Sequence, residues 1–294
     1  MKQLIILISL ILIFASSGFS AAFSLDECDM LLFGSKNSGY VLYTPAYIND
    51  AEHLAFIDTG ASVSSIYKTG SIGFTASGSI KTNGVLGPGV SSITSIDSIN
   101  IIGSTHSNQR FLVKDDPHSG QGLPVHASML IGADVLCKMP LMLDFSNERI
   151  KHLTVKASSP GVEVRSLFVK NIPMIEVLIQ GEKFFAVMDT GATISAVDKK
   201  ALKSSQGVKF EYLRSENISD IFKNSRVSSI MKAEINVIPE VISKASIVEL
   251  DLSNIAEVLG VKVDLILGMD FISQYDWIID YPTQRIFCSR SHHP

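Results

Sequence analysis

Short apolar runs separated by turn residues recur along most of this chain, which is a pattern typical of β-strands. Val41, Tyr43 and Ile48 alternate in part with polar residues and lead toward the apolar run Ala55-Phe56-Ile57. Asn49-Asp50 lies between them, and these residue types tolerate the left-handed conformation of a tight turn. The pattern therefore predicts a β-hairpin that turns near Asn49-Asp50.

The same kind of pattern returns in the second half of the chain. Val177-Leu178-Ile179 and the run from Phe184 to Met188 flank Gln180-Gly181, which predicts another hairpin. Further strands are predicted at Ser92 to Ile102 and at Arg110 to Val113. A chain with many short strands and few long periodic segments is predicted to be mostly β.

A few short helices are predicted among these strands. One spans Asn254 to Leu259, entered by Ser253 and stopped by Gly260. Another follows an apolar run and a glycine, with Asp134 near its start. We interpret Asp134 as a structural hydrogen-bond acceptor rather than as a catalytic acid.

The N-terminus has the pattern of an export signal. Met1-Lys2-Gln3 precedes the apolar run Leu4 to Ala15, and small residues with a plausible cleavage site near Ser20 or Ala22 follow. The sequence thus predicts a signal peptide at residues 1–22 and a periplasmic or secreted protein, with no membrane association after cleavage. An uncleaved N-terminal membrane anchor is the alternative, because no charge follows until Asp26.

Composition restricts the partners and the cofactors. The 294 residues carry a net charge of -4 and no dense cluster of Lys and Arg, which argues against nucleic-acid binding. The histidines show no tight metal-ligand spacing, so neither a metal nor another cofactor is predicted. Cys28, Cys137 and Cys288 could include one disulfide in an exported chain or could all be buried thiols, and the sequence leaves their pairing open.

One four-residue motif occurs twice, at Asp58-Thr59-Gly60-Ala61 and at Asp189-Thr190-Gly191-Ala192. Each copy follows an apolar run and precedes a hydroxyl residue, an aliphatic residue and a serine. Leu130-Ile131-Gly132 also has a second copy, at Ile266-Leu267-Gly268. The spacing between copies is 131 positions for the aspartates (58 to 189) and 136 for these glycines (132 to 268), as tandem copies of one lobe with a small insertion would give.

The duplicated motif delivers two equivalent carboxyl groups. An aspartate on a tight turn after a buried strand is held rigidly, and the glycine beside it leaves room for a close approach. Two carboxyl groups that meet cannot both ionise easily, so the pair holds one proton over a wide pH range. One member can then act as a base on a water molecule while the other acts as an acid on a carbonyl.

The paired motifs resemble those of the aspartic proteases, and specifically a bacterial-type, two-lobed, retropepsin-like branch of that family. The resemblance covers roughly Gly39 to Ser289 and implies an all-β, two-lobed acid-protease fold. Its lobes would be closed β-barrels related by a pseudo-two-fold axis. We therefore expect an N-terminal lobe at residues 39–155, a linker around Lys156 to Gly161 and a C-terminal lobe at residues 164–290.

The resemblance also implies roles for particular residues. Asp58 and Asp189 match the catalytic pair that activates a water molecule. Thr59 and Thr190 match threonines that cross-link the two active-site loops. Residues Gly60 and Gly191 match the glycines that line the floor of the site.

A hairpin tip that covers the cleft, the flap, is assigned to the segment from Gly84 to Gly89, with Gly84 and Gly87 as substrate-binding residues; an ordinary surface turn is the alternative. The second lobe has only the polar segment Ser215 to Arg226 at this place, so we expect a flap from the first lobe alone. Alanine follows the glycine in both motifs, where pepsins have a hydroxyl residue. The loss of that donor predicts a pH optimum less acidic than that of a pepsin.

The predicted function is that of a monomeric aspartic endopeptidase that hydrolyses peptide or protein substrates. The alternative is a catalytically inactive two-lobed module that binds peptides or a protein partner in the same cleft. Both motifs keep the aspartate and the neighbouring glycine, one of which inactive relatives usually lose, and this favours the enzyme.

Overall fold

The computed structural model describes residues 27–35, 39–68, 72–83, 88–115, 127–153, 161–205, 207–219, 225–238 and 241–291. The predicted signal peptide at residues 1–22, the flap glycines Gly84 and Gly87, and all of the predicted linker except Gly161 lie outside the described residues.

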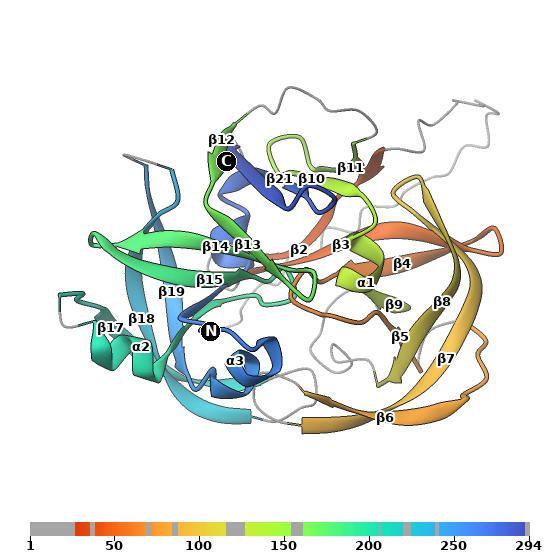
Figure 1. The fold of residues 1–294 in the computed structure, drawn as a ribbon, viewed down its shortest axis with the longest axis horizontal. Helices are drawn as coiled ribbons and strands as arrows, with labels where there is room; N and C mark the ends of the chain where they lie inside the picture. Colours follow the sequence, from red (N-terminus) through yellow and green to blue (C-terminus); the bar gives the residue numbers. More distant parts are fainter. Residues whose placement is uncertain are drawn as a thin grey trace, which may run out of the picture.

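The first half of the chain forms an eight-stranded sheet, which we call the first lobe (Figure 1). The order of its strands across the sheet is β2 (Leu31–Ser35), β3 (Gly39–Ile48), β4 (Ala51–Ile57), β9 (Met129–Ile131), β5 (Ser65–Tyr67), β8 (Ser104–Lys114), β7 (Pro88–Ile101) and β6 (Gly78–Asn83). Strand β2 precedes residue 39, the boundary predicted from the sequence, and pairs with β3 in the same sheet.

The second half forms another eight-stranded sheet, the second lobe. The order of its strands is β13 (Ser166–Val169), β14 (Ile172–Ile179), β15 (Glu182–Met188), β20 (Leu265–Leu267), β16 (Ser195–Asp198), β19 (Ile242–Leu250), β18 (Ser225–Asn236) and β17 (Glu211–Ser219). Each strand has a counterpart at the same place in the first lobe, and the additional pairing of β3 with β7 is matched by that of β14 with β18. The predicted mostly-β, two-lobed architecture with an internal duplication is therefore confirmed at this level.

A third sheet of six strands joins the two lobes. The order of its strands is β1 (Glu27–Asp29), β11 (Arg149–His152), β10 (Pro140–Asp144), β21 (Tyr275–Asp280), β22 (Arg285–Arg290) and β12 (Val162–Val164). Each lobe contributes three strands, and β10 pairs with β21 at the centre with Met142 opposite Ile278. These two residues are 136 positions apart, the offset between the copies, so the central pairing is symmetric when the halves are exchanged.

Four short helices complete the described structure: α1 (Ala133–Leu136), α2 (Lys199–Ser204), α3 (Ser253–Leu259) and α4 (Met269–Ile272). The predicted helix at Asn254 to Leu259 is confirmed as α3, and Gly260 ends it in the left-handed conformation with φ of 75°. Helices α1 and α4 follow the two apolar-apolar-glycine strands. Ala133 of α1 packs in an apolar cluster with Met174 of the second lobe, and α4 contacts β3 of the first lobe.

The turns of the two predicted hairpins are confirmed. Asn49 and Asp50 both have positive φ values, 49° and 63°, between β3 and β4. Gln180 and Gly181 have φ values of 50° and 85° between β14 and β15. Two successive left-handed residues match the right-handed twist of the flanking strands, which is why Asn, Asp and Gly occupy these positions.

The expectation that only the first lobe carries a flap hairpin is wrong. Strands β17 and β18 pair as an antiparallel hairpin at the place where β6 and β7 lie in the first lobe. The polar composition of Ser215 to Arg226 did not indicate a hairpin. A strand with both faces partly exposed lacks the alternation of apolar and polar residues that marks a half-buried strand.

The interior is continuous through the joining sheet. Trp277 is fully buried there, and its Nε1 donates a hydrogen bond to the carbonyl of Ile272 at 2.8 Å. No disulfide joins the three cysteines: Cys288 is buried, and Cys28 and Cys137 are partly buried.

Candidate active site

Two equivalent loops, one from each lobe, form the candidate site. Asp58 directly follows β4, and Asp189 directly follows β15. The amide of Asp58 donates to the carbonyl of Ile131 at 3.0 Å, and the amide of Asp189 donates to the carbonyl of Leu267 at the same distance. Each loop is thus fixed to the neighbouring parallel strand, β9 or β20.

The fold brings the two predicted carboxyl groups into contact. The side chains of Asp58 and Asp189 are close enough to share a hydrogen bond when the pair holds a proton. Oδ1 of Asp58 also accepts hydrogen bonds from the amides of Gly60 and Ala61, at 3.0 and 2.9 Å. Oδ1 of Asp189 accepts from the amide of Gly191 at 2.9 Å. These main-chain donors help to orient both carboxyl groups.

Each loop glycine lies against the carboxyl group of the opposite lobe. A Cβ atom on Gly60 would lie 2.5 Å from Cγ of Asp189, and one on Gly191 would lie 2.5 Å from Cγ of Asp58. Both distances are far below van der Waals contact, so no other residue fits without moving a carboxyl group. The structure therefore gives a physical reason for the glycine in each motif.

The threonines lie beneath the carboxyl groups and are buried. Oγ1 of Thr59 donates to the carbonyl of Met188, and Oγ1 of Thr190 donates to the carbonyl of Ile57, both at 2.7 Å. Each hydroxyl also accepts a hydrogen bond from the main-chain amide of the other threonine. The reciprocal arrangement locks the two loops together across the lobe boundary.

Asp134 holds the end of the first loop, as the structural interpretation predicts. Its Oδ1 accepts hydrogen bonds from the amide of Ser64 at 2.9 Å and from Oγ of Ser64 at 2.6 Å. Oγ of Ser64 in turn accepts from the amide of Gly132 at 3.0 Å. A Cβ atom on Gly132 would lie 2.7 Å from the carbonyl oxygen of Ala61, which explains the glycine at this crossing.

The second lobe repeats this arrangement with Asp270. Its Oδ1 accepts from the amide and from Oγ of Ser195, at 2.8 and 2.7 Å, and its Oδ2 accepts from the amide of Ser246 at 3.2 Å. Burial raises the pKa of Asp270 to about 6 against the effect of these hydrogen bonds. Ser64 and Ser195 have no predicted role, although a serine at the same place in both copies of the motif could have indicated a shared one.

The electrostatics of the carboxyl pair are asymmetric. Burial raises the pKa of Asp58, while the hydrogen bond from Asp189, the loop amides and the positive charge of Lys114 oppose the increase. Burial raises the pKa of Asp189 well above its usual range, and the charge of Asp58 and the hydrogen bond to it add to this increase. Both shifts favour a pair that holds one proton between the two carboxyl groups.

Lys114, which sequence reasoning missed, contributes to this asymmetry, because its charge opposes the increase in the pKa of Asp58. Lys114 ends β8 opposite Tyr67, and burial lowers its pKa while the charge of Asp58 opposes that decrease. In the second lobe, Leu250 occupies the corresponding place, opposite Asp198. Lys114 lies outside both duplicated motifs, so no local pattern marked it.

The predicted flap belongs to the hairpin of β6 and β7. The described pairing continues to Asn83 opposite Pro88, and the predicted flap residues Gly84 and Gly87 lie outside the described residues. Strand β6 contacts α3 of the second lobe (Figure 1). The stem of the hairpin thus reaches across from the first lobe to the second.

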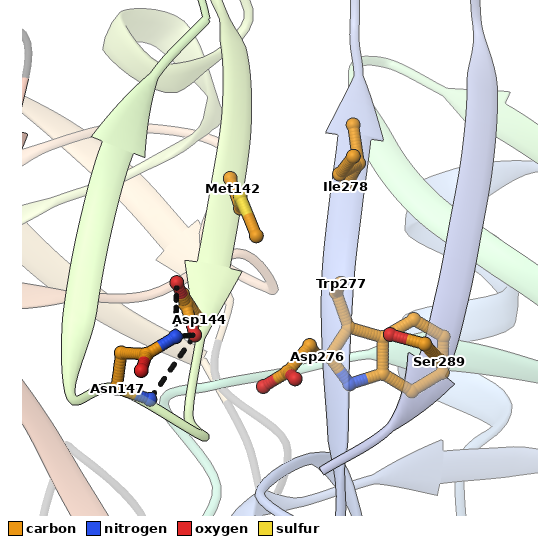
Figure 2. Close-up of a pocket in the computed structure, with 7 residues that line it drawn as sticks. All are labelled: Met142, Asp144, Asn147, Asp276, Trp277, Ile278 and Ser289. Atoms are coloured by element: carbon orange, nitrogen blue, oxygen red, sulfur yellow. Dashed lines mark hydrogen bonds between the residues drawn. The ribbon is translucent and has the colours of Figure 1, made fainter. Parts of the chain in front are cut away.

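A small cavity of about 180 Å³ lies elsewhere, on the joining sheet (Figure 2). Its lining residues are Met142, Asp144, Asn147, Asp276, Trp277, Ile278 and Ser289. The carboxylate of Asp144 accepts hydrogen bonds from Asn147 and pairs with Lys151, while that of Asp276 accepts from Ser146. Because these acids are satisfied within the protein, the cavity is not a second candidate for catalysis.

Within the described part of the chain, no three His, Cys, Asp or Glu side chains gather closely enough to hold a metal ion. None of the helices among those residues combines the length and the hydropathy needed to cross a membrane. No protein-family model matches the chain, and a search of curated proteins found no significant match. The interpretation of the site consequently depends on its own geometry.

Proposed function

We propose that this protein is an aspartic endopeptidase of the retropepsin-like type, in which Asp58 and Asp189 form the catalytic pair. The observation that carries the proposal is the close approach of two carboxyl groups that come from equivalent loops of two duplicated lobes. The glycines against each carboxyl group and the reciprocal threonine contacts support it. The finer fold that we propose has two closed barrels related by a pseudo-two-fold axis, with the substrate cleft between them.

The proposed chemistry is the addition of water to a peptide carbonyl. The charged carboxylate of Asp58 takes a proton from a water molecule, whose oxygen attacks the carbonyl carbon while Asp189 gives its proton to the carbonyl oxygen. The resulting diol collapses as the carbon–nitrogen bond breaks, a diol hydroxyl returns its proton to Asp189, and the proton held by Asp58 passes to the leaving amine. The pair returns to its single-proton state, so no cofactor is consumed.

The test is cleavage of a broad peptide library by the purified full chain, with products identified by mass spectrometry. We expect cleavage that pepstatin inhibits and that is abolished in Asp58→Asn and in Asp189→Asn. Asp97→Asn is the matched control, because Asp97 is exposed on β7 and its loss removes the same charge. A folded wild-type protein that binds library peptides but cleaves none of them would instead support the inactive binding module.

A further inference from the structure

Arg226 is a partly buried cation, and the structure gives no partner for two of its side-chain nitrogens. Nε and Nη2 of its guanidinium group are both buried and make no hydrogen bond to any described residue. Burying a guanidinium group is costly unless an anion or several acceptors compensate it. An arginine in this state therefore marks a place where a ligand group with negative charge is stabilised.

The hairpin directs Arg226 toward the inside of the second lobe. Side chains alternate along β18: Ser228 and Ile230 are buried, whereas Val227 is 74% exposed. Arg226 lies on the same side of the strand as Ser228 and Ile230, because it is two and four residues before them. Its cross-strand partner is Ile218, whose side chain projects from the same face of the hairpin.

Ile218 connects that face to the floor of the candidate site. It packs against an apolar cluster of the second lobe that includes Val187 and Leu250, with Ala192 at its edge. Val187 of β15 is two residues before Asp189, and Ala192 is in the same loop as Asp189, so this cluster borders the carboxyl pair. The inner face of the hairpin, which carries Arg226, therefore packs on the apolar cluster that borders the second active-site loop.

The first lobe has no corresponding charge. Counted from the hairpin tip, the second cross-strand pair is Ile218 with Arg226 in the second lobe and Thr82 with Gly89 in the first. The two halves of the site therefore have equivalent carboxyl groups but differ in the residues at this position of their hairpins. A peptide that lies across both lobes meets a cation beneath only one hairpin.

We propose that Arg226 is a specificity-determining residue that binds a carboxylate side chain of the peptide substrate, on the side of the scissile bond beneath the second-lobe hairpin. This inference rests on the proposed endopeptidase function. The planar guanidinium group binds a carboxylate through two parallel hydrogen bonds. Glutamate fits better than aspartate, because its methylene groups can pack against Ile218 and the apolar cluster while its carboxylate reaches Arg226.

The experiment compares kcat/KM for peptides that carry Glu or Gln, scanned through each position around the bond that the wild type cleaves. At one position we expect the wild type to prefer Glu by at least about tenfold, mainly through KM. Arg226→Gln should bring that ratio close to one. The matched control is Arg214→Gln, because Arg214 is exposed on the same hairpin and pairs with Glu216. An unchanged preference for Glu in Arg226→Gln, or no preference in the wild type, overturns the inference.

A binding measurement separates this inference from the proposed function. Fluorescence anisotropy of labelled Glu and Gln peptides is measured with Asp58→Asn and with the double variant that also carries Arg226→Gln. A Glu preference that disappears with Arg226 supports the inference even if the wild type cleaves no peptide. If circular dichroism shows that Arg226→Gln does not fold, Arg226→Lys replaces it. Lysine keeps the positive charge but cannot make two parallel hydrogen bonds to a carboxylate, so the preference for Glu should be reduced. An undiminished preference overturns the inference.

Discussion

Thr59 and Thr190 exchange hydrogen bonds across the boundary between the lobes. The amide of each donates to Oγ1 of the other, and both distances are 3.1 Å. The two residues are 131 positions apart, so these contacts fix the relative position of loops that the chain itself does not connect locally. The carboxyl pair lies directly beside them in each loop, and its geometry therefore depends on this exchange.

The first prediction concerns Thr59→Val. The change leaves two buried groups, the amide of Thr190 and the carbonyl of Met188, without their hydrogen-bond partner. Each buried unsatisfied group costs about 1–3 kcal/mol, so the free energy of unfolding should fall by about 2–5 kcal/mol in urea denaturation. Thr59→Ser keeps the hydroxyl and should lose only about 1 kcal/mol for one methyl group. Equal stability of the valine variant and the wild type would contradict the proposed role.

The second prediction concerns Gly191→Ala. The new methyl group would lie 2.5 Å from Cγ of Asp58 and must displace that carboxyl group. A displacement of about 1 Å at a reacting group costs about a hundredfold in rate, so the proposed hydrolysis should fall at least that far. Gly73→Ala is the control, since nothing lies within 4 Å of a Cβ atom there. Activity that survives in Gly191→Ala at the level of the control would argue against the assigned geometry.

The third prediction concerns the pH dependence of stability at Asp270. Burial raises its pKa to about 6 in the folded protein, above the usual value of 3.8. The favourable contribution of the protonated Asp270 side chain to the free energy of unfolding is therefore fully present below about pH 4. It is lost as the pH rises through about 6. Asp270→Asn cannot ionise, so the stability of the wild type relative to this variant should decrease between pH 4 and pH 7. Asp97→Asn should show no such trend, and a constant difference for Asp270→Asn would refute the prediction.

Much of the site could be predicted from the sequence because its chemistry is local. Asp58, Thr59 and Gly60 act through a tight turn, and a turn is encoded by adjacent residues. The second copy of the motif then supplied the partner that a single loop lacks. The contact between the two carboxyl groups itself depends on the joining sheet, where Met142 pairs with Ile278 (Figure 2), and only the structure supplies that register.

The rest of the site is encoded by contacts between distant strands. Lys114 affects Asp58 only because β8 runs parallel to β5, and Arg226 lies on the inner face of its hairpin only because of its pairing with Ile218. Neither residue lies in a repeated motif, and the corresponding positions in the other lobe carry different residues. Differences between the copies, such as Leu250 in place of Lys114, are visible in the sequence but have no meaning until the strands are aligned.

The fourth prediction concerns Lys114→Met. The positive charge of Lys114 lowers the pKa of Asp58, so its removal should raise that pKa further. Proposed catalysis requires a charged Asp58, and the acidic limb of the profile of kcat/KM against pH should therefore move to higher pH. Lys232→Met removes the same charge from an exposed position on β18 and should leave the limb in place. A limb that moves equally in both variants would assign the effect to net charge instead.

The last prediction is the pH optimum of the proposed hydrolysis. Burial raises the pKa of both Asp58 and Asp189, and activity needs the first charged and the second protonated. The rate should therefore fall at low pH as Asp58 gains a proton and at high pH as Asp189 loses its proton, with an optimum less acidic than that of pepsins. Ala61 and Ala192 contribute because neither offers a hydroxyl that would favour the charged carboxylates. Replacing both with serine should move the whole profile to lower pH, whereas a wild-type maximum near pH 2 would show that burial does not control this pair.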